Sequence, residues 1–309
     1  MATEAPVANA KKLLDRMTDA EHQTIETEFF GLFYGGKGVH KSTTAMGLAQ
    51  KLRGDGEILF AASGNGFSGL DRFPVLKRHT QHLRMDDPRE LYQLSKALKT
   101  RVKGYEDFTV IVLDDFDSWW QDTLHAFARE QAGTTEDEEL PIIDWTWYGP
   151  PQQAMMNTLK NFYKTTGLHV IVTSHEQGRP LKGEKGGPDR FEPLLGTKLS
   201  AGIGHLAHVV GRFEGRTTRD PVTKKAKHVV EVQIQPSRYV DAKSRLSNTN
   251  EIKVSSVELV KIISDWVNSS SMQEDLSEPE QAVVVEDDLA AQQEEEDFEV
   301  EGDDDPDEG

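Results

Sequence analysis

EFFGLFYGGKGVHKSTTA, residues 28–45, passes from an apolar run through a glycine-rich turn into a helical pattern. The aromatic run before Gly35 predicts a buried strand, and the segment from about Ser42 to Leu52 predicts a helix. Counted from Gly35, the turn fits G-x-x-x-x-[G]-K-[ST], with His40 where the last glycine is expected. In such a loop, backbone N–H groups and a helix N-terminus converge on an anion. An ordinary strand-to-helix turn is the alternative, but the Lys-Ser pair in register favours phosphate binding.

The negative charge of the chain is concentrated at its end. The formal net charge is −18, and residues 272–309 contain 18 Asp and Glu with no Lys or Arg, so residues 1–271 are balanced. A segment with this charge density and few aromatics cannot bury enough apolar surface to fold. We therefore expect three parts: a lead-in at 1–25, one domain at 26–270, and a disordered acidic tail at 271–309.

Other compositional features narrow the class of protein. The sequence has no cysteine, which excludes disulfides, zinc–thiolate sites and a cysteine nucleophile. It has no apolar signal-like region near its start, and no 18 apolar residues run together. These features predict a soluble, cytoplasmic protein without membrane contact.

Beyond the loop, predicted strands and helices alternate, which is typical of an α/β fold with a mainly parallel sheet flanked by helices. The last two strands are separated by a short basic link, which predicts a β-hairpin at the sheet edge. Strands are predicted at 56–63, around 82–85, at 108–115, 167–176, 208–214 and 228–235, and helices at 87–103, 119–132, 152–165 and 254–267.

Polar residues end two of these strands. Asp114 closes the β-branched run 108–115, and Thr173–His175 close the strand that begins near Gly167. In open α/β sheets, ligands bind outside the carboxyl ends of the strands, so these side chains should gather beside Ser42. For Asp114 the structural alternative is a buried strand followed by a helix capped by Asp117 or Ser118.

The segment from Gln177 to Ala201 is rich in glycine, proline and basic residues, and it is predicted to be a long loop. Its basic side chains could contact nucleic-acid phosphates, which would make binding strongly salt-dependent, or they could simply be solvated. The aromatic turn with Trp145 and Trp147 offers a similar choice between core or subunit packing and base stacking.

The strand–loop–helix pattern with Lys41-Ser42, together with Asp114 and Thr173-Ser174-His175, resembles the core of a RecA-like P-loop ATPase. The finer pattern adds Asp144-Trp145, Tyr148 and Ala242-Lys243-Ser244-Arg245. It is similar to a phage branch of that superfamily, the RecA/Rad-like AAA ATPases of the Sak recombinase type. That branch is linked to single-strand annealing and homologous recombination of phage DNA. The resemblance covers about residues 26–246.

The resemblance implies an ATP- and Mg²⁺-binding, DNA-dependent ATPase acting in phage recombination or annealing, located in the host cytoplasm if phage-encoded. Implied partners are single-stranded DNA, further copies of the chain in a ring or filament, and a single-strand-binding protein. The implied nucleotide-binding residues are Gly35, Gly36, Lys37, Gly38, Val39, His40, Lys41, Ser42 and Thr43, with Ser42 and Asp114 as Mg²⁺ ligands. The implied catalytic residues are Lys41, Asp114, Asp115 and His175, the DNA-binding residues Arg179, Lys182, Lys185 and Arg190, and the residues acting in trans Lys243 and Arg245.

Two features depart from that pattern. His40 replaces a loop glycine that often has positive φ, although histidine tolerates this region better than most residues. The second predicted strand ends Ala61-Ala62-Ser63 without the glutamate that usually polarises the attacking water, and Asp115 or Asp117 could substitute. Two alternatives therefore stay open: a helicase- or packaging-type DNA motor, and a nucleotide-gated DNA-binding protein with little hydrolysis.

Overall fold

A computed structural model gives the structure of the chain. It describes residues 28–63, 70–100, 102–165, 167–180, 189–219, 226–237, 240–246, 249 and 252–269. The predicted lead-in at 1–25 and the predicted acidic tail at 271–309 lie outside the described residues.

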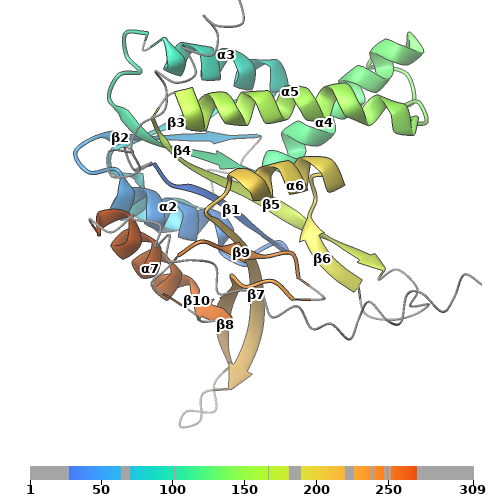
Figure 1. Ribbon diagram of the computed structural model, residues 1–309. Coiled ribbons are helices and arrows are strands. Elements are labelled where there is room, and N and C mark those ends of the chain that lie inside the picture. The colour runs from blue at the N-terminus through green and yellow to red at the C-terminus, as the bar shows by residue number, and fades with distance from the viewer. Residues whose placement is uncertain are drawn as a thin grey trace, which may run out of the picture. The chain divides into compact units, whose positions relative to one another are not determined.

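The described strands form one sheet in the order β10-β8-β7-β1-β5-β4-β2-β3, with β6 paired to β5 and β9 to β7 (Figure 1). The central strands are parallel, since β1 pairs in parallel with both β5 and β7, and β4 with both β2 and β5. The predicted mainly parallel sheet is therefore confirmed. The strands are β1 (Phe30–Gly35), β2 (Glu57–Ala62), β3 (Thr80–Arg84), β4 (Phe108–Asp114), β5 (His169–Pro180), β6 (Asp189–Pro193), β7 (Val209–Arg219), β8 (Ala226–Gln233), β9 (Lys243–Ser244) and β10 (Lys253–Ser255).

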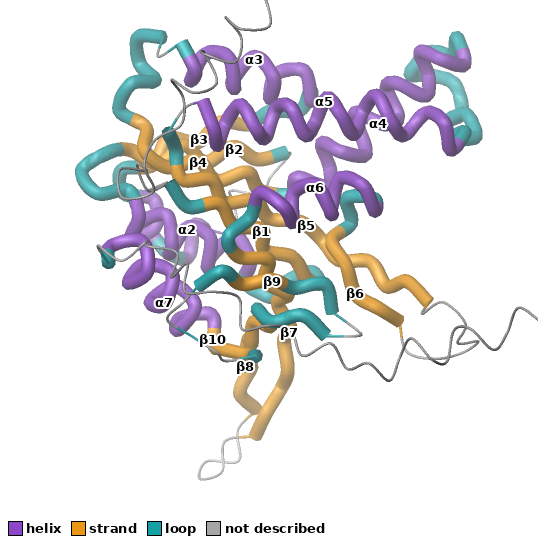
Figure 2. The backbone as a smooth tube through the Cα atoms, viewed as in Figure 1, coloured by secondary structure: helices purple, strands orange, loops and turns teal. Residues whose placement is uncertain are grey.

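Helices cover both faces of this sheet (Figure 2). Successive residues of a strand point to opposite faces, so Leu32 and Val172 pack into one core while Phe33 and Ile171 pack into the other. Helices α3 to α6 lie over the first core, and α2 and α7 pack together over the second. The helices are α2 (Lys41–Leu52), α3 (Pro88–Lys99), α4 (Phe116–Ala132), α5 (Gly149–Lys160), α6 (Thr197–Leu206) and α7 (Ser256–Asn268), with single turns η3 (Pro74–Lys77), η4 (Trp145–Tyr148) and η5 (Asn161–Thr165).

Capping chemistry sets the start of two helices. The Asp87 carboxylate accepts a hydrogen bond from Arg89 N at 2.8 Å ahead of α3, and the Ser255 hydroxyl accepts one from Glu258 N ahead of α7. The end of α3 was predicted wrongly. The helix stops at Lys99 rather than near residue 103, because Thr100 leaves helical geometry, and Val102 is consequently exposed.

The start of α4 also differs from the prediction. The helix begins at Phe116, three residues early, and its N-cap is Asp115 with φ 57° and no side-chain cap. Neither Asp117 nor Ser118 caps the helix, so the predicted capping residues are wrong. Asp117 is buried in the first turn and bonds to β5 instead.

The predicted long loop between Gln177 and Ala201 is largely regular structure. Strand β5 continues to Pro180, and β6 returns antiparallel to it, with Arg179 opposite Arg190. Helix α6 follows, and its buried Leu199 and Ile203 are four residues apart, which is the spacing of one helix face. The glycine and proline content of the segment obscured this short pattern. The tip of the β5–β6 hairpin, at 181–188, lies outside the described residues.

The β-hairpin predicted near residues 208–235 is confirmed as β7 and β8. In the described sheet, the three-residue β10 pairs with β8 and forms the edge on that side. Among the described residues, no helix combines the length and apolar character needed to cross a membrane.

Candidate functional site

The loop between β1 and α2 is shaped by residues with special backbone geometry. A Cβ at Gly35 would lie 2.4 Å from the carbonyl oxygen of Phe213 on β7, so only glycine fits there. Gly38 has φ 75°, and His40, directly before α2, has φ 61°. His40 thus adopts the left-handed conformation that a glycine would supply in this loop. The loop keeps its geometry despite the substitution.

Lys41 turns back onto this loop. Its side chain is buried, and Nζ donates hydrogen bonds to the carbonyl oxygens of Gly35 at 3.1 Å and Gly36 at 2.8 Å. Burial lowers the pKa of Lys41, while the nearby carboxylates of Asp115 and Asp114 act in the opposite direction. The described hydrogen-bond partners of Lys41 Nζ are both neutral carbonyls. An anionic phosphate could replace them and would form a stronger, charge-assisted hydrogen bond.

Asp114 joins three elements at the centre of the site. Its Oδ1 accepts a hydrogen bond from Ser42 Oγ of α2 and another from Thr173 Oγ1 of β5, both at 2.7 Å. Asp114 is only 1 % exposed, and this burial raises its pKa to about 6. A hydroxyl beside a carboxylate is a hard-oxygen pair of the kind that Mg²⁺ prefers, so these residues fit that ion.

His175 is oriented by a second carboxylate. Asp117 Oδ1 accepts from the backbone N–H of His175, and Asp117 Oδ2 lies 2.9 Å from His175 Nδ1. The hydrogen bond to Asp117 raises the pKa of His175, against the effect of burial. Burial would raise the pKa of Asp117, but its hydrogen bonds from His175 outweigh this and hold it below its ordinary value. Both shifts favour the charged form of the pair, an imidazolium and a carboxylate.

Asp115 is the most accessible carboxylate of this cluster. Its backbone N–H donates to Thr173 Oγ1 at 3.0 Å, which fixes the left-handed turn, and its side chain is 29 % exposed. Burial raises the pKa of Asp115. One ligand atom each from Asp115, Asp117 and His175 lies within 4.8 Å of the others. Asp117 engages Nδ1 of the imidazole, so this cluster fixes the orientation of the histidine.

An ion pair on the other face of the sheet also reaches the loop. Arg212 of β7 donates from Nε to Glu176 Oε2 at 2.9 Å, and its guanidinium lies 3.9 Å from the ring centroid of Phe191. A Cβ at Gly36 would lie 3.6 Å from Glu176 Oε1. The sequence analysis missed this pair, because Glu176 and Arg212 lie 36 residues apart and only the β5-β1-β7 strand order brings them together.

The predicted DNA-binding arginines are both paired with acids. Arg179 forms an ion pair with Glu192 and donates to Thr197 Oγ1 at 2.7 Å, and Arg190 lies 3.5 Å from Asp241. Lys182 and Lys185 are outside the described residues.

The two residues predicted to act in trans are engaged within the chain. Lys243 Nζ donates to Gly204 O at 2.5 Å, and Arg245 donates to His205 O at 3.0 Å. Both carbonyls belong to the last turn of α6, where cations satisfy groups that the helix leaves unpaired.

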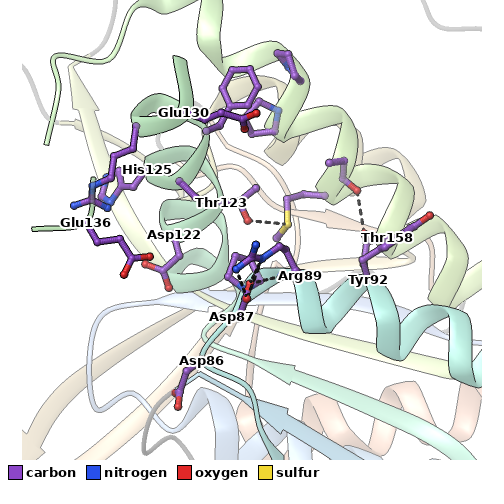
Figure 3. Close-up of a pocket in the computed structure, with 18 of the residues that line it drawn as sticks. Asp86, Asp87, Arg89, Tyr92, Asp122, Thr123, His125, Glu130, Glu136 and Thr158 are labelled. Atoms are coloured by element: carbon purple, nitrogen blue, oxygen red, sulfur yellow. Dashed lines mark hydrogen bonds and ion pairs between the residues drawn. The ribbon is translucent and has the colours of Figure 1, made fainter. Parts of the chain in front are cut away.

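A large cavity among the described residues lies elsewhere. It measures about 1080 Å³ and lies between α3, α4 and α5, where Asp122, Glu130 and Glu136 are among the lining side chains (Figure 3). None of the loop residues lines it, and its acidic lining does not suit a phosphate. The loop, and not this cavity, therefore stays the predicted nucleotide site.

The sequence profile of a family described as an AAA domain matches residues 30–246, and no curated protein sequence matches the chain. Among solved structures, the flagellar accessory protein FlaH from Methanocaldococcus jannaschii is similar at 10% identity and a TM-score of 0.40, covering 73% of this chain and 83% of its own. The RadB recombinase is similar at 14% identity and a TM-score of 0.35, covering 65% and 80%. Because the family match covers more than half of the chain, including the loop, the central strands and Asp114, the chain belongs to this AAA-domain family.

Proposed function

We propose that the chain binds ATP with Mg²⁺ at residues 35–43 and hydrolyses it in a DNA-dependent reaction of recombination or single-strand annealing. One observation carries the proposal: the hydroxyls of Ser42 and Thr173 converge on a single oxygen of the buried Asp114, beside Lys41. A buried carboxylate whose pKa is raised destabilises the fold at neutral pH. Such a group is more typical of a functional site than of a structural one.

The residues around Asp114 have different roles in phosphoryl transfer. This reaction depends on positioning the reactants and neutralising their charge more than on covalent catalysis. Ser42 and Asp114 would hold Mg²⁺, which when bound neutralises charge on the phosphates. Lys41 supplies a cation whose described partners are loop carbonyls. Asp115, with its raised pKa and accessible side chain, is suited to accept the proton of the attacking water. His175, held by Asp117, lies beside it, with Nδ1 3.9 Å from Asp115 Oδ1.

The DNA part of the proposal rests on the resemblance of the motifs to the Sak recombinase type. In that scheme the domain at 26–270 assembles into a ring or filament, Lys243 and Arg245 act on the nucleotide of a neighbouring copy, and the β5–β6 hairpin contacts single-stranded DNA. A phage origin, a single-strand-binding partner and a separate acidic tail belong to the same proposal.

The test is steady-state ATP hydrolysis with and without single-stranded DNA, together with strand annealing. Wild type should hydrolyse ATP faster with DNA, Lys41→Ala should lose both nucleotide binding and turnover, and Asp115→Asn should keep binding but lose about 100-fold or more in rate. Lys51→Ala is the matched control, because Lys51 is an exposed lysine on the same helix. If Lys41→Ala binds ATP as wild type does, the assignment of the loop is wrong.

A nucleotide-gated DNA-binding protein is the second candidate, and the end of β2 favours it. This strand finishes at Ala62, and no carboxylate follows in the described part of that connection, up to Ser63. ATP-dependent DNA binding without turnover, unchanged in Asp115→Asn, would support this candidate. ATP-driven unwinding of duplex DNA would instead support a helicase- or packaging-type motor.

A further inference from the structure

The connection between α4 and α5, residues 133–149, displays two large apolar side chains. Ile142 is 96% exposed and Trp145 is 82% exposed, the highest values among the exposed large hydrophobic residues described. A single exposed apolar residue is ordinary, but tryptophan is enriched among the residues that contribute most to protein interfaces. The nucleotide site uses neither side chain.

This connection is held in a defined conformation. The Asp144 carboxylate accepts hydrogen bonds from the backbone N–H of Thr146 at 2.8 Å and from its hydroxyl at 2.7 Å, which forms the turn η4. Ile143 packs against the core, and the ring of Tyr148 lies 6.3 Å from that of Trp120. Because the turn is fixed at both ends, little conformational entropy would be lost when Trp145 binds a partner.

The same connection is strongly acidic. Residues 133–149 contain five carboxylates and no lysine or arginine, and we call this segment the acidic arm. The five carboxylates belong to Glu136, Asp137, Glu138, Glu139 and Asp144. A surface that receives the arm should therefore offer an apolar hollow with a basic rim.

One cavity of the same chain combines apolar wall residues with an excess of one positive charge in its lining. It measures about 770 Å³ and lies between the β5–β6 hairpin, α6 and residues 241–243, and we call it the α6 cavity. Ala201, Val210 and Ala242 form part of its wall. Its charged lining is Arg179, Arg190 and Lys243 against Glu192 and Asp241, and the exposed Lys198 and Arg245 lie on or beside α6.

We propose that the acidic arm of one copy docks into the α6 cavity of the next, with Trp145 and Ile142 as anchors. The contact joins two different surfaces, so repeating it generates a ring or a filament rather than a closed pair. The cavity between α3, α4 and α5 is excluded as the receptor, because Asp86, Asp122 and Glu130 in its lining would repel the arm. The inference takes from the proposed function only that copies of the chain associate.

This contact would also bring a neighbouring chain to the residues predicted to act in trans. Lys243 lines the α6 cavity, and Arg245 bonds to the adjacent carbonyl of His205. A docked arm would therefore place a second copy next to both cations. The arm thus has a positioning role at the border between copies, distinct from the chemistry at Asp114.

Self-association of the full chain, measured by sedimentation velocity over a concentration series, tests the proposal. Trp145→Ala should weaken it by about 30-fold or more, as expected for an interface anchor, and Ile142→Ala should weaken it less. Ile252→Ala is the matched control, because Ile252 is another exposed isoleucine, 61% exposed, and lies next to β10. Ala201→Trp, which fills the α6 cavity, should weaken association as Trp145→Ala does.

Mixing the Trp145→Ala and Ala201→Trp variants tests whether the arm of one copy binds the cavity of another. Trp145→Ala retains an intact cavity and Ala201→Trp an intact arm, so the two together should form a one-to-one dimer that neither forms alone. A photoreactive benzoylphenylalanine at position 201 should crosslink to residues 133–149 of another copy. Crosslinks to residues 272–309 would overturn the proposal in favour of the acidic tail as the occupant.

Three further results would also overturn it. Association that is equal in wild type and Trp145→Ala assigns the interface to another surface and leaves the ATPase proposal intact. Normal association with weaker single-stranded DNA binding in Trp145→Ala assigns Trp145 to base stacking. A wild type that stays monomeric with ATP and DNA removes both this contact and the oligomeric part of the proposed function.

Discussion

The loop after β1 and the surface around α6 both carry cations, but the partners of those cations differ. Lys41 bonds to two backbone carbonyls of its own loop, whereas Arg179 and Arg190 are paired with carboxylates. Replacing a neutral carbonyl with a phosphate strengthens the hydrogen bond, while drawing an arginine from a carboxylate exchanges one charged partner for another. We therefore expect large effects of mutation at the loop and small, salt-dependent ones at α6.

The largest effect is expected from comparing Lys41→Ala with Lys243→Ala. Lys41 would make charge-assisted hydrogen bonds to phosphate, and losing them should weaken ATP binding by about 100-fold. Lys243 bonds to Gly204 O and should change ATP affinity by less than about threefold in the isolated chain. Titration calorimetry with a slowly hydrolysed ATP analogue measures both. Equal losses in the two variants would abolish the distinction between the regions.

Asp114→Asn should separate stability from function. The pKa of Asp114 is raised from 3.8 to about 6, so its contribution to stability is fully present below pH 3.8 and is lost as the pH rises through 6. Without nucleotide, the variant should therefore unfold with a free energy roughly 2 kcal/mol higher than wild type at pH 7.5, and with no gain near pH 4. Urea unfolding at the two pH values measures this. With Mg²⁺ and ATP, wild type should gain stability and the variant should not.

Asp117→Asn tests the pair that orients His175. The raised pKa of His175 means that its stabilisation is complete below pH 6.5 and is lost as the pH rises through the folded-state value. The lowered pKa of Asp117 means that its own contribution is present above pH 3.8 and is lost as the pH falls through the folded-state value. The variant should therefore lose about 1–2 kcal/mol near pH 6 and less at pH 9.

Asp122→Asn is the control for this experiment, since Asp122 is an exposed acid on the same helix. It should change the unfolding free energy by less than about 0.5 kcal/mol at either pH. A loss in Asp117→Asn that is independent of pH would mean that His175 is not charged in the pair.

The loop site could be predicted from the sequence because its parts are local or lie at strand ends. Lys41 and Ser42 stand at fixed spacing from Gly35, and Asp114 and Thr173 each close an apolar run. Parallel strands then bring these ends together whatever the details of packing.

The α6 region could not be predicted in the same way, because its structure depends on tertiary partners. The antiparallel β6, the ion pair of Arg190 with Asp241 and the bond of Lys243 to Gly204 all join distant segments. The pairing of Glu176 with Arg212 likewise depends on strand order, which the sequence pattern did not give. A glycine- and proline-rich segment with basic residues is read as a loop until such partners are known.

The smallest effect is expected at Arg190. If this arginine contacts a phosphate of single-stranded DNA, Arg190→Ala should reduce the slope of log affinity against log salt by about 0.7. Asp241→Asn should act in the opposite direction, because it releases Arg190 from its carboxylate and should raise DNA affinity about twofold to threefold at low salt. Arg84→Ala is the control, since Arg84 is an exposed arginine paired with Asp86 at the far side of the sheet. If neither Arg190→Ala nor Asp241→Asn changes the salt slope, the cations around α6 only stabilise the protein's own structure. Lys41 would then belong to a ligand site, and the α6 cations to a purely structural region.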